Sequence, residues 1–252
     1  MSSPITQLRL AFSFITTLPA GAFSETVPDA ELGRAQAWFP LVGLLLGLLL
    51  LAAWFLLAPW LAPTIVAVLL LGLHFLLTGG FHLDGVADVT DGLMCGRLDT
   101  EKIFAIMKDS YLGSMGAVAL VLLLLLKFAA LTALLEAGRP GAVLLFPVLG
   151  RYAIVQLTFS CDYARPEGGL GALFTGFCGR REIGLALGTA LVAGLFAAGG
   201  RGLVAVAAVA LYTGAVSFYA RRRFGGVTGD FLGFVCETGE ALALLVLAVG
   251  LG

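Results

Sequence analysis

The stretch Gly79–Gly113 reads GGFHLDGVADVTDGLMCGRLDTEKIFAIMKDSYLG, and it decides how the chain is interpreted. It carries six of the 16 acidic residues in a chain that is 60% hydrophobic. Asp84, Asp88 and Asp91 follow the spacing i, i+4 and i+7, so on a helix their carboxylates point within about 40° of one direction. Like charges at this spacing repel one another. The cluster therefore indicates a compensating cation.

The type of ligand in this cluster favours a hard divalent ion. Carboxylate oxygens without cysteine suit Mg²⁺, so Asp84, Asp88 and Asp91 are the predicted metal ligands. The alternative is a solvated helix face. The apolar segment before the cluster and the glycines within it disfavour that alternative, because glycine weakens an exposed helix.

The composition identifies an integral membrane protein. Charged residues make up 12% of the chain, and the mean hydropathy is +1.01, far from the values of a soluble domain. The net charge of −1 gives no reason to expect a nucleic-acid partner. The four cysteines show no CxxC spacing, which disfavours a disulfide framework or a thiolate metal site.

The hydrophobic segments predict an all-α, polytopic transmembrane helix bundle that forms a single membrane domain over residues 1–252. The run Leu8–Leu18 is too short to cross a bilayer, and we expect an N-terminal helix lying at the membrane interface rather than a signal peptide. The pairs Gly43/Gly47 and Gly184/Gly188 would allow close helix approach. About seven segments are long and apolar enough to span: Phe39–Ala58, Thr64–Gly80, Ser114–Leu135, Ala142–Phe159, Gly184–Gly199, Leu203–Ala220 and Phe231–Leu251.

The basic residues predict the orientation of this bundle. If the N-terminus is cytoplasmic and the spans alternate, Arg139 and Arg201 fall on the outer side, and Lys127 and Arg151 lie inside spans. This bias places the N-terminus, the acidic site and the active face in the cytoplasm. The remaining basic residues all fall on the cytoplasmic side: Arg9, Arg34, Arg97, Lys102, Lys108, Arg165, Arg180, Arg181, Arg221, Arg222 and Arg223.

Charged residues within or beside the spans are further site candidates. An arginine in hydrocarbon costs roughly 2.5–3.5 kcal/mol or more, so Arg151 is expected to pair with an acid or to bind an anionic substrate group, with snorkelling as the alternative. Lys108 and Asp109 place a cation and a carboxylate near the next membrane entry. Asp230 and Glu237 lie seven residues apart on one helix face, and we expect them to share the polar cavity of the aspartates. The glycine-rich segment 161–177 either covers a substrate or serves as a connection.

Several motifs together resemble those of one enzyme family. HLDGVADVTDG at 82–92, IMKDSYLG at 106–113 and GGVTGDFLG at 225–233 are similar to motifs of the cobalamin synthase family, the adenosylcobinamide-GDP ribazoletransferases. FPLVG at 39–43, LTGG at 77–80, KFAAL at 127–131 and GR at 150–151 fit the same pattern. The chain departs from it at Tyr111, where the family ordinarily has arginine, and at Phe234, where alanine is common.

The resemblance implies a multi-pass enzyme of the bacterial inner membrane that acts in the last steps of cobalamin biosynthesis. Such an enzyme is a phosphotransferase-type transferase that joins adenosylcobinamide-GDP to α-ribazole, or to its 5′-phosphate, and releases GMP. It requires Mg²⁺, and the expected partners are these small molecules and the lipid bilayer, with a homo-oligomer left open.

The expected chemistry assigns a role to each site candidate. Asp84, Asp88 and Asp91 would hold Mg²⁺. Asp91 or Asp109 would accept the proton of the attacking hydroxyl. The phosphates and the remaining substrate contacts would fall to Lys108, Arg151, Asp230 and Glu237.

Two other functions compete with this expectation. A phospholipid synthase of the CDP-alcohol phosphotransferase type would also use a cluster of aspartates, but its motif has an Ala-Arg pair three residues after the first Asp-Gly. Here Asp91-Gly92 is followed by Leu93-Met94 and Arg97 is displaced. A cation-coupled transporter would show broken helices in matched halves, and no such symmetry is found in the sequence.

Overall fold

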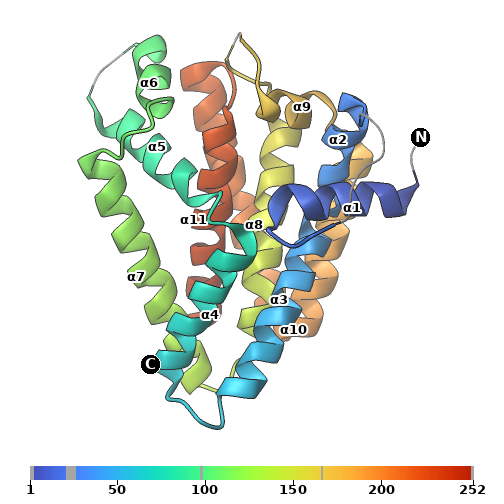
Figure 1. The fold of residues 1–252 in the computed structure, drawn as a ribbon, viewed down its shortest axis with the longest axis vertical. Coiled ribbons are helices and arrows are strands. Elements are labelled where there is room, and N and C mark those ends of the chain that lie inside the picture. The colour runs from blue at the N-terminus through green and yellow to red at the C-terminus, as the bar shows by residue number, and fades with distance from the viewer. Residues whose placement is uncertain (1–2, 21–26, 97–98, 166, 251–252) are drawn as a thin grey trace.

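The computed structural model describes residues 3–20, 27–96, 99–165 and 167–250, and these fold into an all-helical bundle (Figure 1). Within these ranges the extended backbone is limited to one isolated bridge between Tyr163 and Val227. The predicted all-α bundle is confirmed. In chain order its elements are α1 (Pro4–Ile15), α2 (Asp29–Ala35), the 3₁₀ turn η1 (Gln36–Trp38), α3 (Phe39–Leu57), α4 (Pro63–Thr78), α5 (Leu83–Met94), α6 (Thr100–Met107), α7 (Ser114–Glu136), α8 (Gly141–Ser160), α9 (Leu170–Gly176), α10 (Arg180–Phe224) and α11 (Gly229–Ala248).

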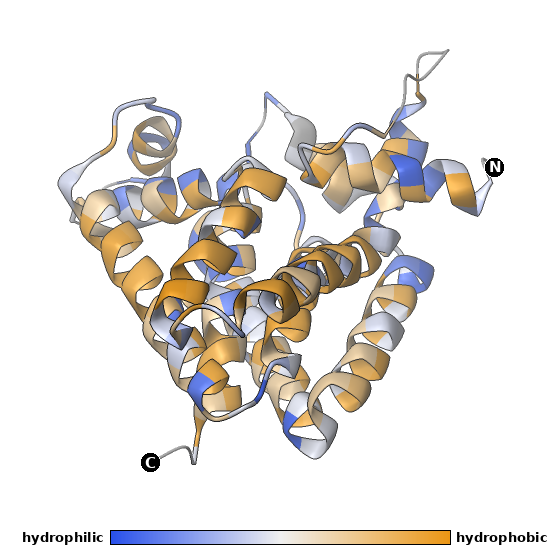
Figure 2. Ribbon diagram, turned by 60° about the horizontal axis from the view of Figure 1, so that its bottom comes forward, coloured by the Kyte–Doolittle hydropathy of each residue, from blue (hydrophilic) through white to orange (hydrophobic). Residues whose placement is uncertain are grey.

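Five helical segments of the described chain are by themselves long and apolar enough to cross a membrane, and the bent pair of α4 and α5 makes six. The pair bends by 91°, at Gly79 and Gly80, which both have positive φ. As a result α4 runs along the bundle, whereas α5 lies across its end (Figure 1). Hydrophobic residues dominate the long helices, and polar residues gather toward the helix ends and the loops (Figure 2).

The 45-residue α10 counts once among these helices, although its backbone reverses at Gly199. This glycine has φ 59° and ψ −136°, a conformation that other residues rarely adopt. On either side of the turn, Gly194 and Gly202 are packed so closely that a Cβ on either would meet the backbone of the other. The arms 180–198 and 200–224 therefore run antiparallel. They correspond to the predicted spans Gly184–Gly199 and Leu203–Ala220.

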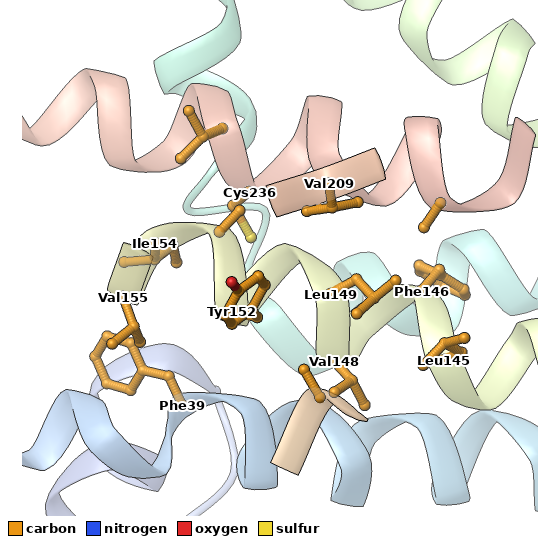
Figure 3. Packing of buried hydrophobic residues seen from close by; sticks show 14 of the residues in the cluster. Phe39, Leu145, Phe146, Val148, Leu149, Tyr152, Ile154, Val155, Val209 and Cys236 are labelled. Atoms are coloured by element: carbon orange, nitrogen blue, oxygen red, sulfur yellow. The ribbon is translucent and has the colours of Figure 1, made fainter. Parts of the chain in front are cut away.

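Helix α8 forms the centre of the bundle and packs against α3, α10 and α11. Fifteen of its 20 residues are buried, and Figure 3 shows several of them between α3 and α11. Gly43 and Gly47 of α3 lie against the backbone of α8 at Pro147 and Leu144, where a side chain would not fit. The close approach expected for this glycine pair is confirmed, whereas Gly184 and Gly188 have open space around them.

The two ends of the bundle differ in what they carry. One end holds α1, α2, α5, α6 and α9, with the loops on either side of them, and the other holds the tight turns 58–62, 137–140 and Gly199 (Figure 1). Helix α1 lies across the first end rather than along the bundle (Figure 1); Ser3 caps it by accepting a hydrogen bond from the Thr6 amide. Its location at a membrane interface stays a prediction. Arg97, which was predicted on the cytoplasmic side, and Leu251, the end of the last predicted span, lie outside the described residues.

Candidate functional site

A cavity of about 220 Å³ opens at the end of the bundle that carries α1 and α5. Three carboxylates line it: Asp84 and Asp88 from α5 and Asp230 from the first turn of α11. The opposite wall is apolar, and its aromatic members come from α1, α3, α9 and the turn before α5. They are Phe14, Phe39, Phe174 and Phe81.

The carboxylates meet because α5 and α11 approach each other through glycine. A Cβ on Gly85 would clash with the carbonyl oxygen of Asp230, and a Cβ on Gly233 would lie 2.8 Å from the carbonyl oxygen of His82. Both glycines belong to the motifs that carried the family resemblance. Their lack of a side chain lets the two helices approach closely, so that Asp84, Asp88 and Asp230 line one cavity.

The crowding of these acids is visible in the pKa of Asp88, which lies on α5, beyond the 91° bend and across the end of the bundle. Burial, together with the nearby charges of Asp230, Asp84 and Asp91, raises that pKa to about 7. A carboxyl group under such repulsion gains from a bound cation, because the cation offsets both the repulsion and the lost hydration.

Asp230 also ties the segment 161–165 to the cavity. Its Oδ2 accepts hydrogen bonds from Nη2 of Arg165 at 2.7 Å and from Oγ1 of Thr228 at 3.0 Å. The backbone of this segment pairs with Val227 through two hydrogen bonds of 2.9 Å. Nε of Arg165 is buried without a partner in the described chain. The prediction that the segment 161–177 covers a substrate remains untested, but residues 162–165 do lie beside the site.

Asp91 lies apart from the cavity. Its Oδ2 accepts a hydrogen bond from the amide of Gly113 at 2.9 Å, and its Oδ1 accepts one from the amide of Gly116 at 2.9 Å. Both amides belong to the start of α7, so Asp91 satisfies backbone donors that the helix leaves open. The three aspartates were expected to point to one side of the helix. A shared direction does not bring Asp84 and Asp91 together, because residues seven apart are separated by roughly 10 Å along a helix.

Lys108 and Asp109 lie in the connection between α6 and α7, where both are exposed. Oδ1 of Asp109 accepts a hydrogen bond from the amide of Tyr111 at 3.1 Å. Neither residue lines the cavity. The substrate and catalytic roles expected for them stay predictions.

Arg151 and Glu237 belong to a second, deeply buried group of charges. Nζ of Lys127 donates to Glu237 at 2.5 Å and to Glu240 at 2.7 Å. Nη1 of Arg151 donates to the other oxygen of Glu240 and lies 3.3 Å from Nε2 of His74. Two bases and two acids therefore neutralise one another inside the bundle. Arg151 was expected to pair with an acid or bind an anionic substrate group, or else to snorkel toward the interface. In the structure it pairs with an acid, Glu240.

His82 is a cavity residue that sequence reasoning did not select. It is buried, lines the cavity beside Asp84, and its Nδ1 has no partner in the part of the chain that the structure describes. The conformation of the turn at Gly79–Gly80 places His82 in the cavity, and the sequence does not give the geometry of that turn. The signal available in the sequence was its place two residues before the first aspartate.

The side chains of the cavity determine whether it can bind the expected Mg²⁺. Among the described residues no three His, Cys, Asp or Glu side chains are arranged so that they alone could hold a metal ion. Mg²⁺, however, commonly takes one or two carboxylates, several waters and the phosphates of its substrate. Asp84, Asp88 and Asp230 supply oxygen donors of this kind on one wall, so the donor set fits that mode of binding.

A bundle of membrane-crossing helices with a carboxylate-lined cavity at one end defines a polytopic membrane protein with an acidic site. The chain matches the family model of cobalamin-5-phosphate synthase over residues 7–248, and it belongs to that family. The family membership expected from the motifs is thereby confirmed.

Curated relatives cover nearly the whole chain. Proteins of Geotalea daltonii and Ectopseudomonas mendocina are 40% and 41% identical, over 96% of this chain and 96% and 98% of their own lengths. A protein of Acetivibrio thermocellus is 33% identical over 95% of this chain and 96% of its own. All three are named adenosylcobinamide-GDP ribazoletransferase, which confirms the expected class of transferases. No solved structure gives a significant match.

Proposed function

We propose that this chain joins adenosylcobinamide-GDP to α-ribazole or α-ribazole 5′-phosphate, with release of GMP. A ribazole hydroxyl attacks the phosphoryl group that bears the corrinoid, and the bond from that phosphorus to the GMP oxygen breaks. The single observation that carries the proposal is the cavity in which Asp84 and Asp88 of one motif face Asp230 of another. The names of the curated relatives support it.

The carboxylate wall is proposed as the site of Mg²⁺ and of the diphosphate. When bound, Mg²⁺ would neutralise phosphate oxygens and the leaving GMP. Asp84 and Asp88 would hold the ion, and Asp230 would complete the wall. Arg165 is kept at its edge by Asp230; its free Nε can donate to a phosphate oxygen while Nη2 stays on the carboxylate.

The aromatic wall is proposed to receive the base of the ribazole. Phe14 is its centre, with ring centroids 4.8 Å from Phe174 and 6.1 Å from Phe81. Such rings stack well on a flat apolar group. Their side chains offer no hydrogen-bonding partner to guanine, whose polar edge would lose its water without compensation. The wall therefore suits a benzimidazole rather than the GMP base.

The basic residues support a cytoplasmic location for the cavity in a bacterial inner membrane. At the end opposite the cavity the described chain carries Arg139 and Arg201, and the excess of Lys and Arg marks the cytoplasmic side. The described basic residues at the cavity end are Arg9, Arg34, Lys102, Lys108, Arg165, Arg180, Arg181, Arg221, Arg222 and Arg223.

The proposed reaction is tested by following GMP release from the purified protein. Release should depend on adenosylcobinamide-GDP, α-ribazole and Mg²⁺ together. Asp84→Asn and Asp88→Asn should each lower the rate about a hundredfold, because each removes charge that balances the cation. Asp29→Asn, at an exposed carboxylate of α2, serves as the matched control. Release of CMP from a CDP-alcohol, or no need for the corrinoid, would contradict the proposal.

The aromatic wall is tested by Phe81→Leu, since Phe81 is 59% exposed and its replacement spares the core. Loss of a stacking partner should raise KM for α-ribazole roughly 2- to 10-fold, with KM for adenosylcobinamide-GDP unchanged. A rise confined to the corrinoid substrate would assign the wall to the other reactant.

A further inference from the structure

A second cavity lies at the end of the bundle opposite the carboxylates. It encloses about 420 Å³ between the turn 137–140, the reversal of α10 and the last turn of α11. Arg139 and Arg201 line it, together with small and apolar residues such as Gly138, Ala197 and Leu247. Among the described residues that line it, none is acidic.

The two arginines give the lining of this cavity a positive charge. Arg201 is exposed, and its guanidinium has no hydrogen bond or ion pair within the described chain. Arg139 donates one long hydrogen bond of 3.4 Å to the carbonyl oxygen of Leu247. Helix α8 also begins at this cavity, after Pro140 and without a side-chain cap, so its first amides add to the positive potential.

A third cavity, which is apolar, adjoins this arginine-lined cavity and shares Arg201 with it. It encloses about 350 Å³ between the second arm of α10 and α11, and its other lining residues are Val204, Val246, Val249 and Gly250. Val204 and Val249 are 59% and 71% exposed, so this surface faces the surroundings of the bundle. A cationic pocket thus continues into an apolar groove along two membrane-crossing helices.

We propose that this pair of cavities binds a phospholipid with an anionic headgroup. The guanidinium groups of Arg139 and Arg201 would hold the phosphate, for which a planar fork of donors is well suited. An acyl chain would lie along Val204, Val246 and Val249. Simple snorkelling of the arginines to the headgroups would need neither the shared cavity nor the groove.

The proposed lipid would join parts of the bundle that are far apart in sequence. The cavity brings together the end of α7, the start of α8, the reversal of α10 and the end of α11. A headgroup bound there would act as a clamp on these four elements, at the end remote from the carboxylates. Its effect is therefore on stability, and GMP release from the folded protein is independent of it.

The full-length protein in neutral detergent provides the test, with thermal unfolding as the readout. Phosphatidylglycerol should raise the Tm of the wild type, since a ligand that binds the folded state stabilises it, and phosphatidylcholine should raise it less. Arg201→Gln should weaken the apparent affinity for phosphatidylglycerol about tenfold or more. This residue has no partner whose loss would disturb folding, and Arg201→Lys should restore part of the affinity.

The matched control is the pair Arg180→Gln and Arg181→Gln, which are exposed at the other end of the bundle. Both variants should respond to phosphatidylglycerol as the wild type does. Equal Tm shifts in Arg201→Gln and the wild type would overturn the proposal. So would an equal shift produced by inorganic phosphate alone, because the site would then bind phosphate without using the apolar groove.

Discussion

At the scale of single residues, the buried charges inside the bundle explain how an apolar chain tolerates two bases in its spans. Lys127 contacts two carboxylates, and Arg151 contacts one of the same two. Each charge taken out of water is costly on its own, and the opposite charges of the group offset that cost. Nε and Nη2 of Arg151 have no hydrogen-bond partner in the described chain.

We predict that Lys127→Met destabilises the protein by about 3–5 kcal/mol, because Glu237 and Glu240 then share a single cation. Thermal unfolding of the purified protein in detergent measures the loss. Lys127→Arg, which keeps the charge, should retain most of the stability. An unchanged Tm in Lys127→Met would show that the group is not maintained as an ion-paired unit.

Asp91 is the residue where sequence and geometry point to different roles, and its substitution separates them. Asp91→Asn should lower stability by about 0.5–2 kcal/mol, since one of the two backbone amides at the start of α7 loses its carboxylate acceptor. The Mg²⁺ concentration that gives half-maximal activity should stay at the wild-type value. A marked rise in that concentration would instead support the metal role expected from the spacing.

The sequence was informative about which residues carry the site and less so about their partners. The spacing of Asp84 and Asp88 and the resemblance pointed to the cavity, and Asp230 was expected there as well. Glu237 was expected beside them and lies instead with Lys127. Pairing between α7 and α11 depends on which helices become neighbours, and hydrophobic segments carry little information on that choice.

At the scale of elements, the contact between α5 and α11 sets the geometry of the cavity. We predict that Gly85→Ala forces these helices apart, because its Cβ would clash with the backbone of Asp230, and that GMP release falls at least tenfold. Gly72→Ala is the matched control, since Gly72 lies in α4 with open space around it. There alanine favours the helix. Equal activity of the two variants would contradict a tight contact.

Hydropathy predicted the long helices well, and the short ones poorly. The predicted spans correspond to α3, α4, α7, α8, both arms of α10 and α11. Helices α2 and α9 are not predicted by the sequence, because seven-residue helices leave too short a pattern to recognise. Gly79 and Gly80 mark a turn between α4 and α5, but the angle of that bend depends on packing at the bundle end.

At the scale of the whole molecule, the carboxylate cavity and the arginine-lined cavity lie at opposite ends of the bundle. The labelling of a native thiol can show which end faces the cytoplasm. Cys95 is exposed beside α5, so a membrane-impermeant maleimide should label it in inside-out vesicles and not in intact spheroplasts. Cys161 and Cys236 are buried, and Cys95→Ser should remove most of the signal. Labelling in spheroplasts would place the carboxylate cavity on the outer side.

The pairing of Lys127 with Glu237 also sets a condition on biogenesis. The two residues are 110 positions apart in the chain, so a ribosome that adds 5–20 residues per second makes the acid roughly 5–20 s after the base. During that interval α7 carries an uncompensated ammonium group. A nascent chain interrupted before α11 would leave this charge permanently without its counter-ions, which makes such fragments natural targets for membrane proteases.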